Sequence, residues 1–201
     1  FINKFKIKKI ELNHKINNSK YSIEFEDETI KKIKKLKLDL IIRLGSKILK
    51  GKILDCSRSG IISFHHGDNK FFRGGPAGFW EVYYGRNDTG FIIQKLSNKL
   101  DAGDVIYKGS FKTKPYFLAN QVDVRYRSIY HLKKVLKIYE KNRKFKFLKK
   151  YKVSKKIFKN PNFLQVINYL KKIIFRKLFL NKKIQYWNIA ISKSKFNEMD
   201  H

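Results

Sequence analysis

Gly60-Ile61-Ile62-Ser63-Phe64-His65-His66-Gly67-Asp68-Asn69 is the stretch that decides the fold, because an apolar run passes directly into a polar loop. The apolar run, Gly60–Phe64, predicts a buried strand. In open α/β sheets, ligands bind beyond the carboxyl ends of the strands. The polar residues that follow this strand are therefore candidates for a functional site: His65, His66, Asp68 and Asn69.

Helices and strands alternate on the amino-terminal side of this stretch. Acidic residues 26–28 come before apolar positions at helical spacing, and lysines follow, an order of charge that suits the dipole of a helix. The expected elements are, in chain order, strands at Ile7–Leu12 and Tyr21–Phe25, a helix that begins at Glu26, a strand at Leu38–Ile42 with a turn at Gly45, and a short helix through Ile48–Leu54. This alternation predicts an α/β fold with a mostly parallel sheet.

The alternation continues on the carboxyl-terminal side and then gives way to a basic stretch. The expected elements are a helix opened by Pro76 and closed by Gly85, a strand at Thr89–Leu96, a turn at Leu100–Asp104, a strand at Val105–Phe111, a long helix at Leu118–Tyr139, and an amphipathic helix that begins at Phe163. We expect residues 1–140 to form one domain, residues 141–184 to be a basic linker with the amphipathic helix, and residues 185–201 to begin a further domain.

The chain is strongly basic. Its 201 residues include 47 Lys and Arg against 16 Asp and Glu, which gives a formal net charge of +31. Such a charge attracts nucleic acid or an anionic membrane surface. Lys, Ile, Asn and Phe are abundant together, as an AT-biased genome would produce, so both origins of the charge stay open. The helix from Phe163 is expected to dock on protein or, alternatively, to lie on a membrane surface.

A single cysteine, Cys56, excludes an intrachain disulfide, and the sequence has no Cys/His spacing that predicts a metal site. A reducing, cytoplasmic location is expected. The first residues have neither a signal peptide nor an initiator Met, so we expect a fragment. No uncharged apolar run is long enough to predict a membrane span.

Four short motifs together resemble the formyltransferase family. Its members carry Asn-x-His, then Arg-Gly, then a Thr-Gly strand and then Asp-x-Gly-Asp. The corresponding stretches here are Ser63-Phe64-His65, Arg73-Gly74, Thr89-Gly90 and Asp101-Ala102-Gly103-Asp104, and their spacings agree without a gap. The resemblance covers roughly residues 39–109. It implies a Rossmann-like formyltransferase fold for residues 1–140, with the first strand missing and basic helices after it.

The resemblance also implies a reaction, the transfer of a formyl group from 10-formyltetrahydrofolate to an amine. His65 would stabilise the negative oxygen of the tetrahedral intermediate. Asp101 would hold the imidazole and help to collect the proton that the amine loses. Ser63 would assist, although it is a hydroxyl where the family has the amide of asparagine, and Asn69 could supply the missing amide.

Further residues are expected at the formyl donor and in the loop near the site. The segment after Leu38–Ile42 resembles the wall of the family's folate pocket, so Leu44, Gly45 and Asp104 are expected at the donor. His66, Asp68 and Asn69 are expected in the loop near the site, with direct contact to a substrate as the alternative, and Arg73 is expected to fix that loop.

The acceptor stays open between two substrates. The loop from His65 and the Arg73–Pro76 segment resemble a subgroup joined to a glycosyltransferase-type domain, which favours a small amine such as an amino sugar or glycan precursor. The positive charge favours methionyl-tRNA instead. The alternative without catalysis is a degenerate domain that binds a polyanion or a membrane surface.

Overall fold

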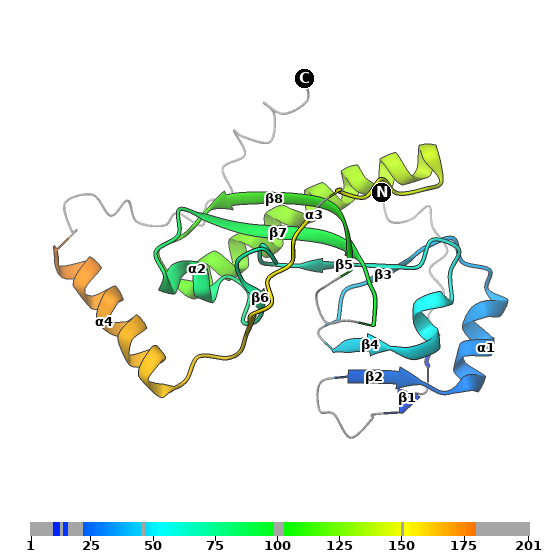
Figure 1. Ribbon diagram of the computed structural model, residues 1–201, viewed down its shortest axis with the longest axis horizontal. Coiled ribbons are helices and arrows are strands. Elements are labelled where there is room, and N and C mark those ends of the chain that lie inside the picture. Colours follow the sequence, from blue (N-terminus) through cyan, green and yellow to red (C-terminus); the bar gives the residue numbers. More distant parts are fainter. Residues whose placement is uncertain are drawn as a thin grey trace. The chain divides into compact units, whose positions relative to one another are not determined.

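The computed structural model describes residues 10–12, 14–15, 22–45, 47–98, 103–149 and 151–179. It confirms the predicted α/β class and divides the chain into two compact units, Phe1–Asn160 and Pro161–His201 (Figure 1). The described elements of the first unit are β1 (His14–Lys15), β2 (Ser22–Phe25), α1 (Asp27–Lys35), β3 (Ile41–Arg43), β4 (Ile48–Lys50), a 3₁₀ helix η2 (Gly51–Asp55), β5 (Ile61–His65), β6 (Arg73–Gly74), α2 (Phe79–Tyr83), β7 (Asp88–Lys95), β8 (Asp104–Lys112), α3 (Phe117–Asn142) and β9 (Ile157–Phe158).

The sheet that carries the candidate site has four strands in the order β3-β5-β7-β8. β3 and β5 are parallel, whereas β5 and β7, and β7 and β8, are antiparallel. The predicted parallel pairing is therefore confirmed only in part, for β3 with β5 and for β2 with β4. The connection between β7 and β8 is too short for the crossover that parallel neighbours need, so these two strands form an antiparallel pair.

The predicted short helix through Ile48–Leu54 is wrong. Residues Ile48–Lys50 form β4, which pairs in parallel with β2, and only Gly51–Asp55 turns into a 3₁₀ helix. Gly51 separates the two because its φ of +74° is a left-handed conformation, which a helix interior does not contain. The apolar side chains of Ile53 and Leu54 are nevertheless buried, as their spacing indicated.

The two faces of β5 belong to two different apolar clusters. Ile61 packs with buried residues of α1 and η2, whereas Ile62 packs with residues of β7 and α3. Because side chains alternate along a strand, Ser63 and His65 lie on the face of Ile61 and Phe64 lies on the α3 face. The sheet thus presents Ser63 and His65 on the side that α3 does not cover.

Residues 143–160 belong to the first unit, and most of the described residues of the basic stretch Lys141–Lys159, which was expected to be a linker or to lie on the surface, are exposed. β9 pairs in parallel with β6, and the amide of Leu148 donates a hydrogen bond of 2.8 Å to the carbonyl oxygen of Val105. We name residues 143–160 the return segment. Its contacts extend the first unit beyond residue 140, where the sequence suggested a boundary.

The second unit contains α4 (Phe163–Phe179), which confirms the helix predicted to begin at Phe163. Among the described helices, none is long and apolar enough to cross a membrane. The predicted further domain at residues 185–201, and most of the predicted strand at Ile7–Leu12, lie outside the described residues.

Candidate active site

His65 is the last residue of β5 and leads into the polar loop, as the sequence predicted. Its side chain is only 8% exposed, and its Nε2 lies 3.4 Å from the carbonyl oxygen of Phe72. Gly67 provides the space for the ring: a Cβ at this position would lie 2.9 Å from His65 Nε2 and 3.0 Å from the Phe72 oxygen. The imidazole is therefore enclosed between the end of β5 and the loop that returns at Phe72.

Ser63 lies in a row of paired residues that crosses three strands, with Arg43 of β3 on one side and Gln94 of β7 on the other. The Ser63 hydroxyl donates to the Arg43 carbonyl oxygen at 3.2 Å and accepts from Arg43 Nη1 at 3.4 Å. Gln94 is 1% exposed, and its Oε1 has no hydrogen-bond partner among the described residues. The sequence reasoning missed Gln94, whose signal was an amide after the apolar run Phe91-Ile92-Ile93.

The residues predicted at the formyl donor lie at the ends of two strands. Because β3 and β5 are parallel, Leu44 and Gly45 leave the sheet at the same edge as His65. Leu44 is 78% exposed, and a Cβ at Gly45 would meet nothing within 4 Å. Asp104 begins β8, where it pairs with Lys95 and is exposed. Asp101 lies outside the described residues, so its predicted approach to His65 stays a prediction.

The return segment holds the loop that follows His65. The Tyr151 hydroxyl donates to Asp68 Oδ1 at 2.6 Å, and the amide of Lys70 donates to the same oxygen at 2.9 Å. Burial, together with the Asp68 carboxylate, raises the pKa of Tyr151 far above its usual value. The amide of Ser154 donates to the carbonyl oxygen of Asn69, whose side chain is fully buried. Tyr151 carried no signal in the sequence, because a contact across 83 residues has no local pattern.

Two of the four motifs take part in packing this loop. Arg73 Nη1 donates to the carbonyl oxygen of Ser154 at 3.3 Å, so this guanidinium contacts the return segment. Gly74 has a φ of +101° and lies directly against the backbone of Phe158. A Cβ at Gly90 would lie 2.7 Å from the Cβ of Asp68. The Arg-Gly and Thr-Gly motifs therefore need their glycines for close approach of the backbone.

His66 packs toward α3 and away from the Ser63 face. Its ring stacks on Phe64 at 5.2 Å, and its Nε2 lies 3.1 Å from the hydroxyl of Ser128 in α3. Burial lowers the pKa of His66 to about 4, and the positive charges of Arg125 and His65 add to this effect. The imidazole is therefore neutral at pH 7, and its position suits packing better than contact with a substrate.

Glu81 is a buried acid that the sequence reasoning missed. It lies in α2 within Phe79-Trp80-Glu81-Val82-Tyr83, and its side chain is 2% exposed. Burial raises the pKa of Glu81 to about 7, although a backbone hydrogen bond to its carboxyl group and the charge of His65 act in the opposite direction. The signal in the sequence was a single acidic residue within a run of aromatic and apolar residues.

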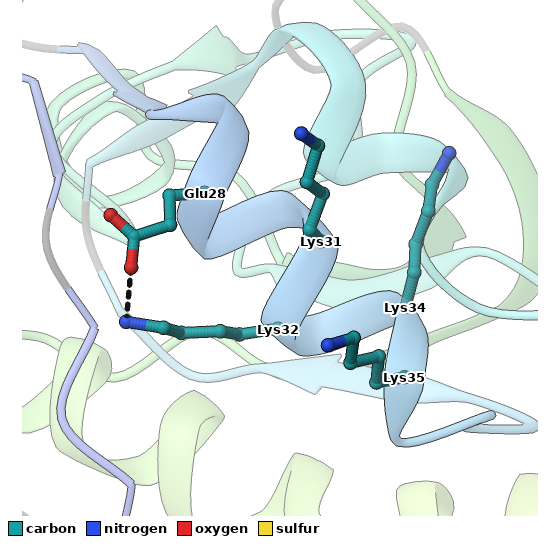
Figure 2. A pocket seen from close by; sticks show the side chains of 5 residues that line it. All are labelled: Glu28, Lys31, Lys32, Lys34 and Lys35. Atoms are coloured by element: carbon teal, nitrogen blue, oxygen red, sulfur yellow. Dashed lines mark ion pairs between the residues drawn. The ribbon is translucent and has the colours of Figure 1, made fainter.

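A separate basic surface lies on α1. Lys31, Lys32, Lys34 and Lys35 line a hollow of about 550 Å³ together with Glu28, which forms an ion pair of 2.8 Å with Lys32 (Figure 2). In Figure 1, α1 lies beyond the end of the central sheet at which β5 begins, away from the β5 arrowhead that ends at His65. This hollow can attract anions, but it is distinct from the His65 site.

Comparison with known proteins gives one family and several relatives. The family model described as "Formyl transferase" matches residues 3–134. Methionyl-tRNA formyltransferases of Bacillus subtilis (strain 168) and Bacillus velezensis are 37% and 36% identical over 82 and 83 residues, which are 40% and 41% of this chain. These matches span 26% of each relative, about a quarter of its length. A solved glycinamide ribonucleotide transformylase 1 from Symbiobacterium toebii is 16% identical, with a TM-score of 0.46 over 59% of this chain and 60% of that chain.

Proposed function

Because the chain belongs to the formyl transferase family, we propose that it transfers a formyl group from 10-formyltetrahydrofolate to an amine. The observation that carries this proposal is the position of His65. It ends β5 at the motif spacing, and Gly67 and the Phe72 carbonyl hold its imidazole in place. In this proposal the imidazole takes part in the reaction itself.

The residues at the edge of β3 fit a flat, partly apolar donor. Leu44 exposes an apolar side chain there, and the space around Gly45 is open. Exposed apolar surface beside open space suits the burial of an aromatic ring. The donor, when bound, supplies the formyl carbon that the amine attacks. In this proposal Leu44 and Gly45 lie against its ring system, and Asp104 supports the Asp101 turn.

His65 acts on the oxygen of the formyl group. When the amine adds to the formyl carbon, this oxygen becomes negative, and the imidazole N–H stabilises it by donating a hydrogen bond. One preorganised donor of this kind is worth about 3–4 kcal/mol in comparable sites. The Asp101 carboxylate holds the imidazole and takes the proton that the amine loses. Ser63, which stands where the family motif has its asparagine, assists from the same face, and its cross-strand neighbour Gln94 provides an amide.

The test is formyl transfer by the chain and by its site variants. His65→Ala and Asp101→Ala should each lower kcat/KM by at least about 10²-fold, because each removes a group that acts in the transition state. Lys70→Ala is the control, since Lys70 is exposed and belongs to the same loop. Release of tetrahydrofolate measures the rate. Turnover that is unchanged in His65→Ala would refute the proposed site.

For the acceptor, we favour the amine of an amino sugar or glycan precursor. The return segment supports this choice, because Tyr151, Ser154 and Phe158 tie the basic stretch to the first unit. A stretch that lies against the loop has a packing role and does not need to bind phosphates.

Methionyl-tRNA is the second candidate, favoured by the lysine-lined hollow on α1 and by the names of the sequence relatives. The dependence of binding on salt concentration distinguishes the two candidate acceptors. Binding to several phosphates should weaken by roughly 10³-fold between about 50 and 200 mM salt, whereas a small amino sugar should show little dependence. Tight, salt-sensitive binding of methionyl-tRNA with formylation of its amino group would decide for the second candidate.

A further inference from the structure

The loop after β5 forms a turn around Asp68. The main-chain carbonyl oxygen of Asp68 accepts hydrogen bonds of 2.8 Å from the amides of Phe71 and Phe72. Its side-chain Oδ1 accepts a further hydrogen bond of 2.9 Å from the amide of Lys70. One aspartate therefore fixes three successive amides. The carbonyl oxygen of Phe72, the last of these residues, lies 3.4 Å from His65 Nε2, so the turn ends directly against the imidazole.

The turn is tightly packed on both sides of Asp68. A Cβ at Gly67 would lie 2.9 Å from His65 Nε2. A Cβ at Gly90 of β7 would lie 2.7 Å from Asp68 Cβ. Interiors packed at this density transmit a displacement to the next neighbour and do not absorb it. A movement of Asp68 is therefore passed to the His65 ring through Gly67 and through the turn that Asp68 holds together.

The return segment contacts this turn through a side chain and through the main chain. The Tyr151 hydroxyl donates to Asp68 Oδ1 at 2.6 Å, a short distance typical of a hydroxyl that donates to a carboxylate. The amide of Ser154 donates to the carbonyl oxygen of Asn69 at 2.8 Å. Because the Ser154 contact belongs to the main chain, the Tyr151 hydroxyl is the contact that a single substitution can remove.

The side chains of residues 151–158 fall into two sets. Tyr151 and Phe158 are half-buried, and the Phe158 ring packs against that of Phe72 with 5.2 Å between the centroids. The lysines of the same stretch are exposed: Lys152, Lys155 and Lys156. The stretch is therefore basic on its solvent side, whereas its aromatic residues contact the loop that follows β5.

We propose that Tyr151 is a positioning residue for His65. Its hydroxyl holds Asp68, and Asp68 holds the turn that ends at the Phe72 carbonyl group. This carbonyl group lies against the imidazole, so the Tyr151 contact sets the position from which His65 acts on the formyl oxygen. The effect on reaction rate rests on the proposed formyl transfer, but the effect on the position of the ring does not.

The position of the ring can be measured without activity. Tyr151→Phe keeps the aromatic ring and removes the hydroxyl that contacts Asp68. In the full chain labelled with ¹⁵N, amide hydrogen exchange at residues 70–72 should become about three- to thirtyfold faster, because a local opening of the turn costs less without this contact. The imidazole signals of His65 should shift as well. Tyr126→Phe is the matched control, since Tyr126 is 55% exposed on α3.

The same spectra contain an internal reference. The imidazole of His131 contacts the hydroxyl of Tyr107, so its signals should stay where they are in the wild type. Unchanged exchange at residues 70–72 together with unchanged His65 signals would overturn the proposal. Equal changes in Tyr126→Phe would overturn it too. Faster exchange throughout β5 and β7 with a lower Tm would also contradict it, because a residue that only stabilises the fold has that effect.

The rate gives a second readout. Tyr151→Phe should lower kcat by about three- to thirtyfold, less than the roughly 10²-fold that a displacement of 1 Å can cost, and should leave KM within about twofold. Added to Asp68→Ala, the same substitution should lower kcat no further, since both remove one contact. An additive loss, or a change in KM alone, would overturn the proposal. If the wild-type chain transfers no formyl group at all, the proposed function fails, and the exchange and imidazole measurements still decide the role of Tyr151.

Discussion

Gly67→Ala should move the His65 imidazole without disturbing the rest of the fold. Gly67 has no left-handed φ, so its backbone accepts an alanine. The added methyl group would lie 2.9 Å from His65 Nε2 and 3.0 Å from the Phe72 carbonyl oxygen, whereas ordinary contacts begin at 3.4 Å. The ring must therefore retreat by about 0.5 Å, the difference between 3.4 and 2.9 Å, or the loop must open by a similar amount.

The expected effect on catalysis follows from that displacement. A shift of about 1 Å in a catalytic group can cost about 10²-fold in rate, and loss of one oxyanion donor costs about 10²- to 10³-fold. A shift of half that size should lower kcat/KM by roughly 10- to 100-fold. The effect should appear in kcat more than in KM, since the imidazole acts on charge that develops in the transition state.

The assay compares formyl transfer and thermal unfolding in two alanine variants of the same loop. Gly75→Ala is the matched control, because a Cβ at Gly75 meets nothing within 4 Å and its amide can still donate to the Phe158 carbonyl. Gly67→Ala should lose activity with little change in Tm, and Gly75→Ala should keep the activity and the Tm of the wild type. Full activity in Gly67→Ala, or equal losses in the two variants, would refute the role given to the His65 position.

Two further predictions concern buried residues on and beside the sheet. Ser63→Asn restores the amide of the family motif beside Gln94, so kcat/KM should be maintained or raised; a sharp loss, measured in the same assay, would show that the hydroxyl contact with Arg43 has its own role. Glu81→Gln should also change the pH dependence of stability. Burial raises the pKa of Glu81 from 4.5 to about 7, so the native state binds the extra proton within this window and wild-type stability falls as pH rises through it. Relative to wild type, Glu81→Gln should therefore gain up to about 3 kcal/mol between about pH 5 and pH 8 in urea unfolding, and a parallel pH dependence of the two proteins would contradict the assignment.

Local patterns predicted most of the elements in the first unit. The patterns that predict α1, β5 and α3 involve only neighbours within a few residues. The sequence therefore placed each of these elements within a few residues of its position. It was harder to predict whether neighbouring strands pair in parallel or antiparallel. β7 has the same apolar character in a parallel or an antiparallel pair, and its orientation follows from its partners and connections rather than from its composition.

The candidate site was predictable where the motifs are contiguous and not where it depends on distant contacts. His65 at the strand end was recognisable from the largely apolar run Gly60–Phe64 and the polar loop that follows it. Gln94 could not be recognised in this way, because only the strand register places it beside Ser63. Glu81 was not, because a five-residue helix gives too few positions to show which side is buried. Tyr151 could not have been found, since its partner Asp68 is 83 residues away.

The return segment shows that the site is larger than the part of the chain that the family model matches. That match ends at residue 134, whereas residues 151–158 supply the hydroxyl on Asp68, the amide on Asn69 and the strand beside Gly74. Without them, Asn69 and Gly75 would lose backbone hydrogen-bond partners, and the Asp68 carboxylate would lose the Tyr151 donor. Unsatisfied groups of this kind are costly where they are buried. The basic segment that looks like a linker in the sequence therefore completes the hydrogen bonding of the loop that follows His65.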